Sequence, residues 1–191
     1  MSTTADSALP AWSLRLISEL DAADRKAESV AKGLSTAQLN WQPKQGTWSI
    51  GQCLEHLHIA NEVYLPAISA ALDGRLHTTV QEVRLGRFSR WFIQHYIAPN
   101  PAGTRARAPK KIEPAKHVEP LILETFLHSN QAARRLVRHA SEFDVNHLRF
   151  KNPFIPILRF TVGTGLEIVA KHQSRHLLQA EGVRNNPGFP Q

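Results

Sequence analysis

The chain has 191 residues, of which 42% are hydrophobic and 20% charged, a composition typical of one globular domain that needs neither disulfides nor a structural metal to fold. Its single cysteine, Cys53, excludes an intramolecular disulfide and fits a reducing compartment. No apolar run approaches the roughly 20 residues that a membrane span requires. We therefore expect a cytoplasmic protein with a single domain over residues 1–191, preceded by no signal peptide and starting with a flexible tail at residues 1–10.

The net charge of +7 is concentrated between Arg84 and Lys116, where eight lysines and arginines accompany a single acid, Glu113. Clustered cations can bind nucleic acid, attract small anionic ligands or simply be solvated. Since no nucleic-acid-reading motif accompanies the charge, we do not expect a nucleic-acid partner, and a membrane-surface role is weaker still.

Four segments carry apolar residues at alternating spacings of three and four, the pattern of amphipathic helices. The first covers residues 16–34, and Gly33 suits its end. Directly after it, Ser35 begins a Ser-x-x-Gln capping box, which predicts a short helical turn.

The second amphipathic helix covers residues 50–71. Thr47 or Ser49 can cap its first turn, and the Asp-Gly pair at residues 73–74 ends it. Pro66 lies inside the helix and predicts a kink.

Residues 74–118 form a long insertion between the second and third helices. Inside it, residues 87–97 predict an extra helix that lays Trp91, Phe92 and Ile97 on the bundle, whereas the remainder has the composition of loop. Long connections serve as crossovers in helix bundles and often carry function.

The third helix covers residues 122–140, with Pro120 suited to its first turn, and the fourth covers residues 162–183. Between them, the prolines of residues 152–160 favour an extended loop over a strand. The expected fold is all-α: a four-helix bundle with a long crossover insertion between helices two and three.

His172 and His176 lie one turn apart on the fourth helix, so that both imidazoles can converge on one metal ion. His176 falls within the apolar stripe and His172 flanks it, which directs both rings inward. The alternative is a chance pair, because the chain has ten histidines and buried histidines more often hydrogen-bond a neighbour. Gln173 stands where a zinc-peptidase helix carries its general base, which argues against a peptidase.

The second helix offers a third ligand in His56 or His58, and periodicity alone does not choose between them. Cys53 is a further option, although buried helical cysteines are usually small core residues. The remaining histidines are expected at the surface or in local hydrogen bonds: His77, His95, His117, His128, His139 and His147.

Three stretches together resemble the DinB-like superfamily: WSIGQCLEHLHIANEVY at residues 48–64, HQSRHLLQAEGV at residues 172–183 and PGFP at residues 187–190. The resemblance extends from about residue 12 to the C-terminus. It implies a four-helix bundle related to transferases and isomerases that use bacillithiol, mycothiol or glutathione.

The same resemblance implies a three-histidine metal site and assigns it to His56, His172 and His176. Many relatives carry an acid a few residues after the first of these histidines. This chain has Ile59, Ala60 and Asn61 there, followed by Glu62, so that the role of the acid does not transfer.

Three neutral imidazoles leave open positions on a metal, as in catalytic sites, and imidazole suits Zn, Ni, Fe or Mn. A low-molecular-weight thiol is the expected cosubstrate, and the small-molecule substrate is expected to be anionic or thiol-bearing, with the basic insertion supplying cations. Arg175, Gln179 and Asn61 are candidates for side chains that orient the ligands.

The resulting hypothesis is a metal-dependent thiol S-transferase or hydrolase. The alternatives are a non-enzymatic binding module that retains the bundle and metal site, and a nucleic-acid binder that uses the basic insertion. Bundles of this kind often form homodimers through exposed apolar surface.

Overall fold

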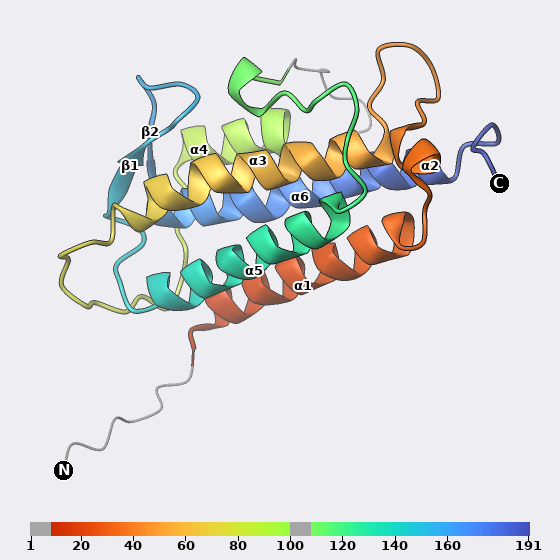
Figure 1. Cartoon of the computed structure of the whole chain (residues 1–191). Helices are drawn as coiled ribbons and strands as arrows, with labels where there is room; N and C mark the ends of the chain where they lie inside the picture. The colour runs from red at the N-terminus through yellow and green to blue at the C-terminus, as the bar shows by residue number, and fades with distance from the viewer. Residues whose placement is uncertain (1–8, 100–107) are drawn as a thin grey trace.

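The computed structural model describes residues 9–99 and 108–191 and contains the four long helices that the sequence predicts (Figure 1). Two helix layers face each other: α3 and α6 form one, and α1 and α5 form the other. α1 and α6 run in one direction and α3 and α5 in the opposite one. In chain order the elements are α1 (Ala11–Ala31), α2 (Thr36–Asn40), α3 (Ile50–Ser69), α4 (Arg87–Phe92), the π-helix η1 (Ile93–Ile97), the 3₁₀ turn η2 (Lys110–Ile112), α5 (Ile122–Ala140), β1 (Arg149–Lys151), β2 (Arg159–Thr161) and α6 (Val162–Arg184).

The crossover between α3 and α5 follows from their common direction. Because both helices run the same way, the chain must return along the length of the bundle before α5 begins. This return contains α4, η1 and η2. The expected tail at residues 1–10 lies mostly, and residues 100–107 of the crossover lie entirely, outside the described residues.

The extra helix expected at residues 87–97 exists, but its buried face differs from the expected one. Ile93 is its buried residue, while Phe92 and Ile97 pack partly against the core and Trp91 is 45% exposed. Trp91 is therefore more exposed than the prediction implies, although its side chain lines a cavity between this segment and the bundle. The second half of the segment is a π-helix, whose wider turn rotates the side chains away from the 3.6-residue pattern.

Side-chain caps fix the starts of three helices. Ser35 and Ser49 each form a complete capping box, and Ser49, not Thr47, begins α3. Thr161 caps α6 by accepting a hydrogen bond from the amide of Thr164. These caps determine where α3 and α6 begin, and these two helices carry the site described below.

A short antiparallel hairpin, β1–β2, corrects the expectation of loop throughout residues 152–160. Phe150 pairs with Phe160 in its register, and both side chains are buried. An isolated two-stranded hairpin is marginal in water, so the burial of these two rings against the bundle supplies the missing stabilisation. Residues 152–158 form the loop that connects the strands.

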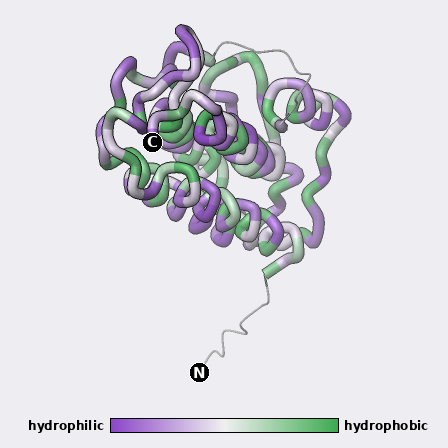
Figure 2. The backbone as a smooth tube through the Cα atoms, turned by 90° about the vertical axis from the view of Figure 1, so that its right-hand side faces the viewer, coloured by the Kyte–Doolittle hydropathy of each residue, from purple (hydrophilic) through white to green (hydrophobic). Residues whose placement is uncertain are grey.

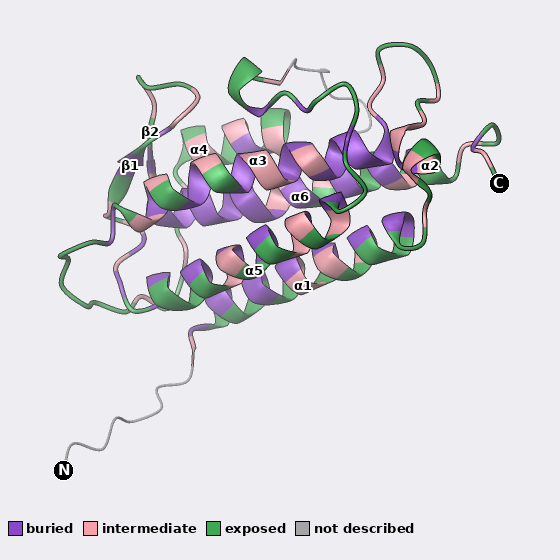
Figure 3. Ribbon diagram, in the orientation of Figure 1, coloured by how far each residue is buried: buried purple, intermediate pink, exposed green. Residues whose placement is uncertain are grey.

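Buried residues line the sides on which the long helices face one another (Figure 3). The core has two apolar clusters, and buried polar residues lie between them along the helices. Between the clusters, Gln173 donates to Asn130 at 2.7 Å, and Asn130 donates to Asp24 at 2.6 Å. Asn61 donates to Ser129 at 3.1 Å nearby. Buried amides need such partners, which fixes the register of α1, α3, α5 and α6 at this level.

Short hydrophobic and hydrophilic stretches alternate along the helical parts of the backbone (Figure 2), as expected where each turn of an amphipathic helix has an apolar and a polar side. Among the described residues, no helix combines the length and the apolar character that crossing a membrane demands.

Two glycines of α6 allow a test of core packing. A Cβ at Gly165 would lie 2.7 Å from Cε1 of Phe150 and 2.9 Å from Cδ1 of Ile68, both buried side chains. We expect Gly165→Ala to lower the free energy of unfolding by about 1–3 kcal/mol through overpacking.

The matched control is Gly182→Ala, whose added Cβ meets nothing within 4 Å. This variant is expected to raise the free energy of unfolding by up to about 1 kcal/mol through helix propensity. Urea unfolding followed by circular dichroism measures both, and a stable Gly165→Ala variant would contradict the packing.

Candidate metal centre

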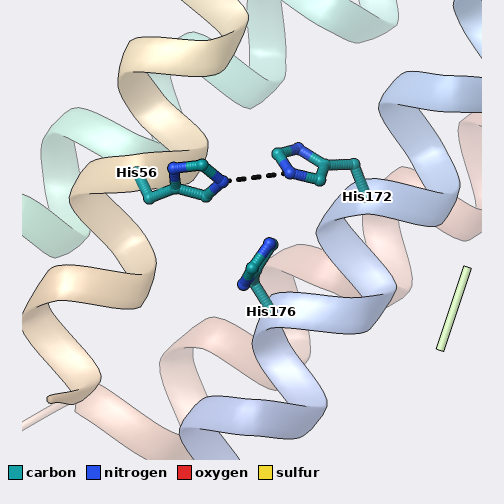
Figure 4. Close-up of side chains that lie close together, drawn as sticks. All are labelled: His56, His172 and His176. Atoms are coloured by element: carbon teal, nitrogen blue, oxygen red, sulfur yellow. Dashed lines mark hydrogen bonds between the residues drawn. The ribbon is translucent and has the colours of Figure 1, made fainter. Parts of the chain in front are cut away.

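Three histidines from two helices meet inside the bundle (Figure 4). His56 comes from α3, and His172 and His176 come from consecutive turns of α6. One ring nitrogen of each lies within 4.8 Å of the other two, and Nε2 of His56 is 3.0 Å from Nε2 of His172. Zn–N bonds of about 2.0–2.1 Å in tetrahedral geometry place ligand nitrogens roughly 3.3 Å apart. The cluster therefore has the donor set that a divalent metal requires, and the His56–His172 pair is close to the required spacing.

Hydrogen bonds orient two of these rings. Nδ1 of His56 donates to the carbonyl oxygen of Ile112 at 2.7 Å, and Nδ1 of His176 donates to Oε1 of Gln179 at 3.1 Å. With the proton on Nδ1, each ring keeps the lone pair on Nε2 for a metal. Histidine ligands in metalloproteins commonly have such an outer partner, which fixes the tautomer and the ring orientation.

Burial keeps the three imidazoles neutral. It lowers the pKa of His56, lowers the pKa of His172 well below its ordinary value, and lowers the pKa of His176 to about 3. The positive charge of Arg175 lowers the pKa of all three further. Neutral imidazole is the form that binds metal, so the cluster is ready to bind at neutral pH.

The crossover supplies the carbonyl that orients His56, and side chains of the bundle hold this part of the crossover in place. Oε2 of Glu55 accepts a hydrogen bond from the amide of Ala115 at 2.6 Å. Asn40 bonds both the amide and the carbonyl of Val118, at 2.8 and 2.9 Å. Ile112 itself is buried. The chain between α3 and α5 is thereby fastened to α3 through Glu55 and to α2 through Asn40.

A cavity of about 540 Å³ adjoins the three histidines, and its size suits a small-molecule ligand. The indole of Trp48 packs against His56, with ring centroids 4.7 Å apart, and forms part of the wall. Apart from the histidines, the hydroxyl, amide and charged side chains of the lining are those of Asn61, Tyr64, Tyr96, Asn152 and Arg175, and the described lining contains no carboxylate. Most of the remaining wall is apolar: Phe88, Trp91, Phe92, Ile97, Ile112, Phe154, Ile155, Leu158, Ile168 and Val169.

The other residues singled out from the sequence have different positions. Gln179 contacts His176, whereas Arg175 donates to the carbonyl of Tyr96 and lines the cavity without bonding a histidine. Asn61 lines the cavity while its amide donates to Ser129.

The alternatives for the third ligand lie outside the cluster. His58 does not join it, and Cys53 is buried in the apolar core, where burial raises the pKa of its thiol. Glu62 is exposed and does not line the cavity. Two contacts escaped sequence reasoning: the Ile112 carbonyl, which has no side-chain signal, and Trp48, which appeared only as a motif residue.

Comparisons with known proteins identify the family and the fold of the chain. A family model described as the DinB superfamily matches residues 19–180. Among solved structures, the chain is similar to YfiT from Bacillus subtilis, with a TM-score of 0.60 and 14% identity over 99% of this chain and 95% of that one. YfiT is described as a probable metal-dependent hydrolase with an unusual four-helix bundle topology. No curated protein matches the sequence. The chain belongs to the DinB superfamily.

Proposed function

We propose that the protein is a metal-dependent enzyme in which His56, His172 and His176 hold one divalent ion and the adjoining cavity receives the substrate. The observation that carries this proposal is the convergence of three neutral imidazoles at the wall of a cavity of about 540 Å³. Three protein ligands leave a coordination position free, as in catalytic rather than structural sites.

The chemistry that suits the site is activation of a nucleophile. A bound divalent ion supplies Lewis acidity, which stabilises an anionic nucleophile at neutral pH. The described lining has no carboxylate that could act as a general base. A thiol, with an ordinary pKa of about 8.5, needs much less help to ionise than water. We therefore favour thiol S-transfer, in which a low-molecular-weight thiol attacks an electrophile held in the cavity.

Arg175 contributes a positive charge to this site. Its guanidinium lines the cavity and is held by the carbonyl of Tyr96 at 2.8 Å. Its effect on the pKa of all three histidines indicates that its field extends over the cluster. The same field favours a thiolate or a carboxylate-bearing thiol over a neutral one.

Metal-dependent hydrolysis is the second candidate, and the description of YfiT as a probable metal-dependent hydrolase favours it. Water would then replace the thiol as nucleophile, with the same three histidines holding the metal. The two candidates share the site and differ in the cosubstrate.

Metal removal and reloading test the proposal. Protein treated with a chelator is divided and reloaded with Zn, Ni, Fe or Mn, and each sample is assayed with glutathione, bacillithiol or mycothiol and the electrophile monochlorobimane. Hydrolysis of p-nitrophenyl esters without thiol is measured in parallel. We expect turnover in at least one metal-loaded sample and none after chelation. Metal and ligand binding without turnover would instead support a non-enzymatic binding module, and absence of metal from both isolated and reloaded protein would refute the metal centre.

A further inference from the structure

The end of the cavity away from the histidines has its own polar pair, Tyr64 and Asn152. Both line the cavity, and each is only 4% exposed. Tyr64 follows His56 by eight residues on α3, which corresponds to roughly 12 Å along the helix axis. On the antiparallel helix α6, the lining extends over the same length, from His176 back to Ile168. The cavity is therefore elongated, with the histidines and the polar pair at different levels.

The amide of Asn152 can point only one way. Its Oδ1 accepts hydrogen bonds from the backbone amides of Phe154 at 2.8 Å and Ile155 at 2.9 Å. The atom bonded to two N–H groups must be the oxygen, so the other atom is the amide nitrogen. This Nδ2 donates to the hydroxyl oxygen of Tyr64 at 3.2 Å.

The hydroxyl of Tyr64 consequently keeps its own proton for another partner. It accepts from Asn152, and no acceptor for its proton occurs in the described part of the chain. The ring is fixed between Phe150, edge to face at 5.4 Å, and Phe154, stacked at 5.8 Å. Burial raises the pKa of Tyr64, so the hydroxyl stays protonated at neutral pH. A buried donor without an acceptor is unfavourable, and a ligand acceptor would relieve that cost.

The surroundings of this donor select the kind of acceptor. Phe154, Ile155 and Leu158 form the apolar wall around it, and the lining cation, Arg175, lies one residue from His176 at the other level. A carboxylate at the Tyr64 end would lose its hydration without gaining a cation, whereas a neutral carbonyl needs only one donor. Sugar hydroxyls would likewise remain unpaired against these walls.

We propose that Tyr64 is a specificity-determining residue, and that the cavity binds an elongated, mainly apolar molecule whose neutral carbonyl accepts its hydrogen bond while the reacting end lies at the histidines. This inference rests on the proposed function, because it assigns the electrophilic substrate of that same site to a chemical class. The thiol enters at the histidine end, where Arg175 lies.

Two hydroxamates test the assignment, and they differ in whether a single CH2 group is replaced by a carbonyl. Octanohydroxamic acid binds a metal through its head group and carries an apolar tail. Its 7-oxo derivative adds a carbonyl that lies about 10 Å from the bound metal in the extended chain, and the two levels of the cavity lie roughly 12 Å apart. Binding to zinc-loaded protein is measured by isothermal titration calorimetry. We expect the 7-oxo compound to bind roughly three- to tenfold more tightly, the range of one net hydrogen bond.

Variants of the polar pair identify the donor. Tyr64→Phe keeps the ring and should abolish or invert the preference, because the carbonyl then loses hydration without gaining a bond. Asn152→Asp keeps the two backbone contacts but replaces the donating amide by a carboxylate oxygen, which accepts a hydrogen bond from the hydroxyl of Tyr64. Because that hydroxyl is then no longer available to a ligand, this variant should also abolish the preference, although Tyr64 is present. The control is Ser29→Ala, which removes an exposed hydroxyl of α1 outside the cavity lining and should leave the preference unchanged.

The outcomes separate this inference from the metal centre. Equal binding of the two hydroxamates to the wild type, or a preference that survives Tyr64→Phe, would overturn the role of Tyr64 and leave the metal centre intact. Failure of both compounds to bind protein that carries zinc would overturn the inference as well, whereas absence of zinc from the reloaded protein would overturn the metal centre itself.

Discussion

Replacement of His176 by alanine is expected to remove tight metal binding. The variant loses one of three ligands, and the remaining pair, His56 and His172, comes from different helices without the third ring to complete the site. Loss of an outer partner such as Gln179 typically weakens metal affinity about 10–100-fold, so loss of a ligand should exceed this range. Elemental analysis of reloaded, gel-filtered protein should find about one metal per wild-type chain and almost none in the variant.

Two further variants serve as controls for the loss of metal binding in His176→Ala. His128→Ala removes an exposed histidine of α5 outside the cluster and should leave the metal content unchanged. Gln179→Ala keeps the three ligands and removes the acceptor for Nδ1 of His176, so it should bind metal with intermediate affinity. A His176→Ala variant with undiminished affinity would place the metal elsewhere.

The metal-free protein is expected to lose stability as the pH falls from about 6.5 to 4.5. The three histidines have a lowered pKa in the folded state, so the unfolded chain binds protons in this range while the folded chain does not. Stability rises with pH wherever the unfolded state binds more protons, and acid therefore favours unfolding. With its pKa lowered to about 3, His176 alone contributes roughly 2 kcal/mol over this window.

Urea unfolding at a series of pH values measures this effect. Glu19 and Asp144 also have a lowered pKa, but their ordinary values of 4.5 and 3.8 place their contribution at lower pH. A His176→Gln variant should therefore show a flatter dependence between pH 6.5 and 4.5 and an unchanged slope below it. Equal slopes for variant and wild type in the upper window would mean that His176 is protonated in the folded protein.

Local patterns predicted the bundle because each long helix carries its own signal. The apolar spacing of α1, α3, α5 and α6, together with the capping boxes at Ser35 and Ser49, depends only on neighbouring residues. The face of residues 87–97 was not predictable in this way, since the π-helix that buries Ile93 changes the period. The hairpin at Phe150 and Phe160 likewise depends on packing against helices distant in sequence.

The site could be predicted in part. The spacing of His172 and His176 places both on one side of α6, but the helical period leaves His56 and His58 equivalent, and only the family resemblance separated them. The partner of His56 is the backbone carbonyl of Ile112, 56 residues away. Every residue has a backbone carbonyl, so the residue type does not reveal which carbonyl contacts His56. That depends on how the crossover docks onto the bundle. The same holds for the contact of Tyr64 with Asn152, 88 residues apart.

The hydrogen bond between His56 and Ile112 joins a candidate metal ligand to the crossover. Metal binding and docking of the crossover onto the bundle are therefore thermodynamically coupled. If the docked crossover favours metal binding by holding His56 in the metal-binding tautomer, bound metal must stabilise the docked crossover by the same free energy. Metal should therefore slow amide hydrogen exchange at Ala115 and Val118, whose amides donate to Glu55 and Asn40. A loop between two helices would then report the occupancy of a site to which it contributes no side-chain ligand.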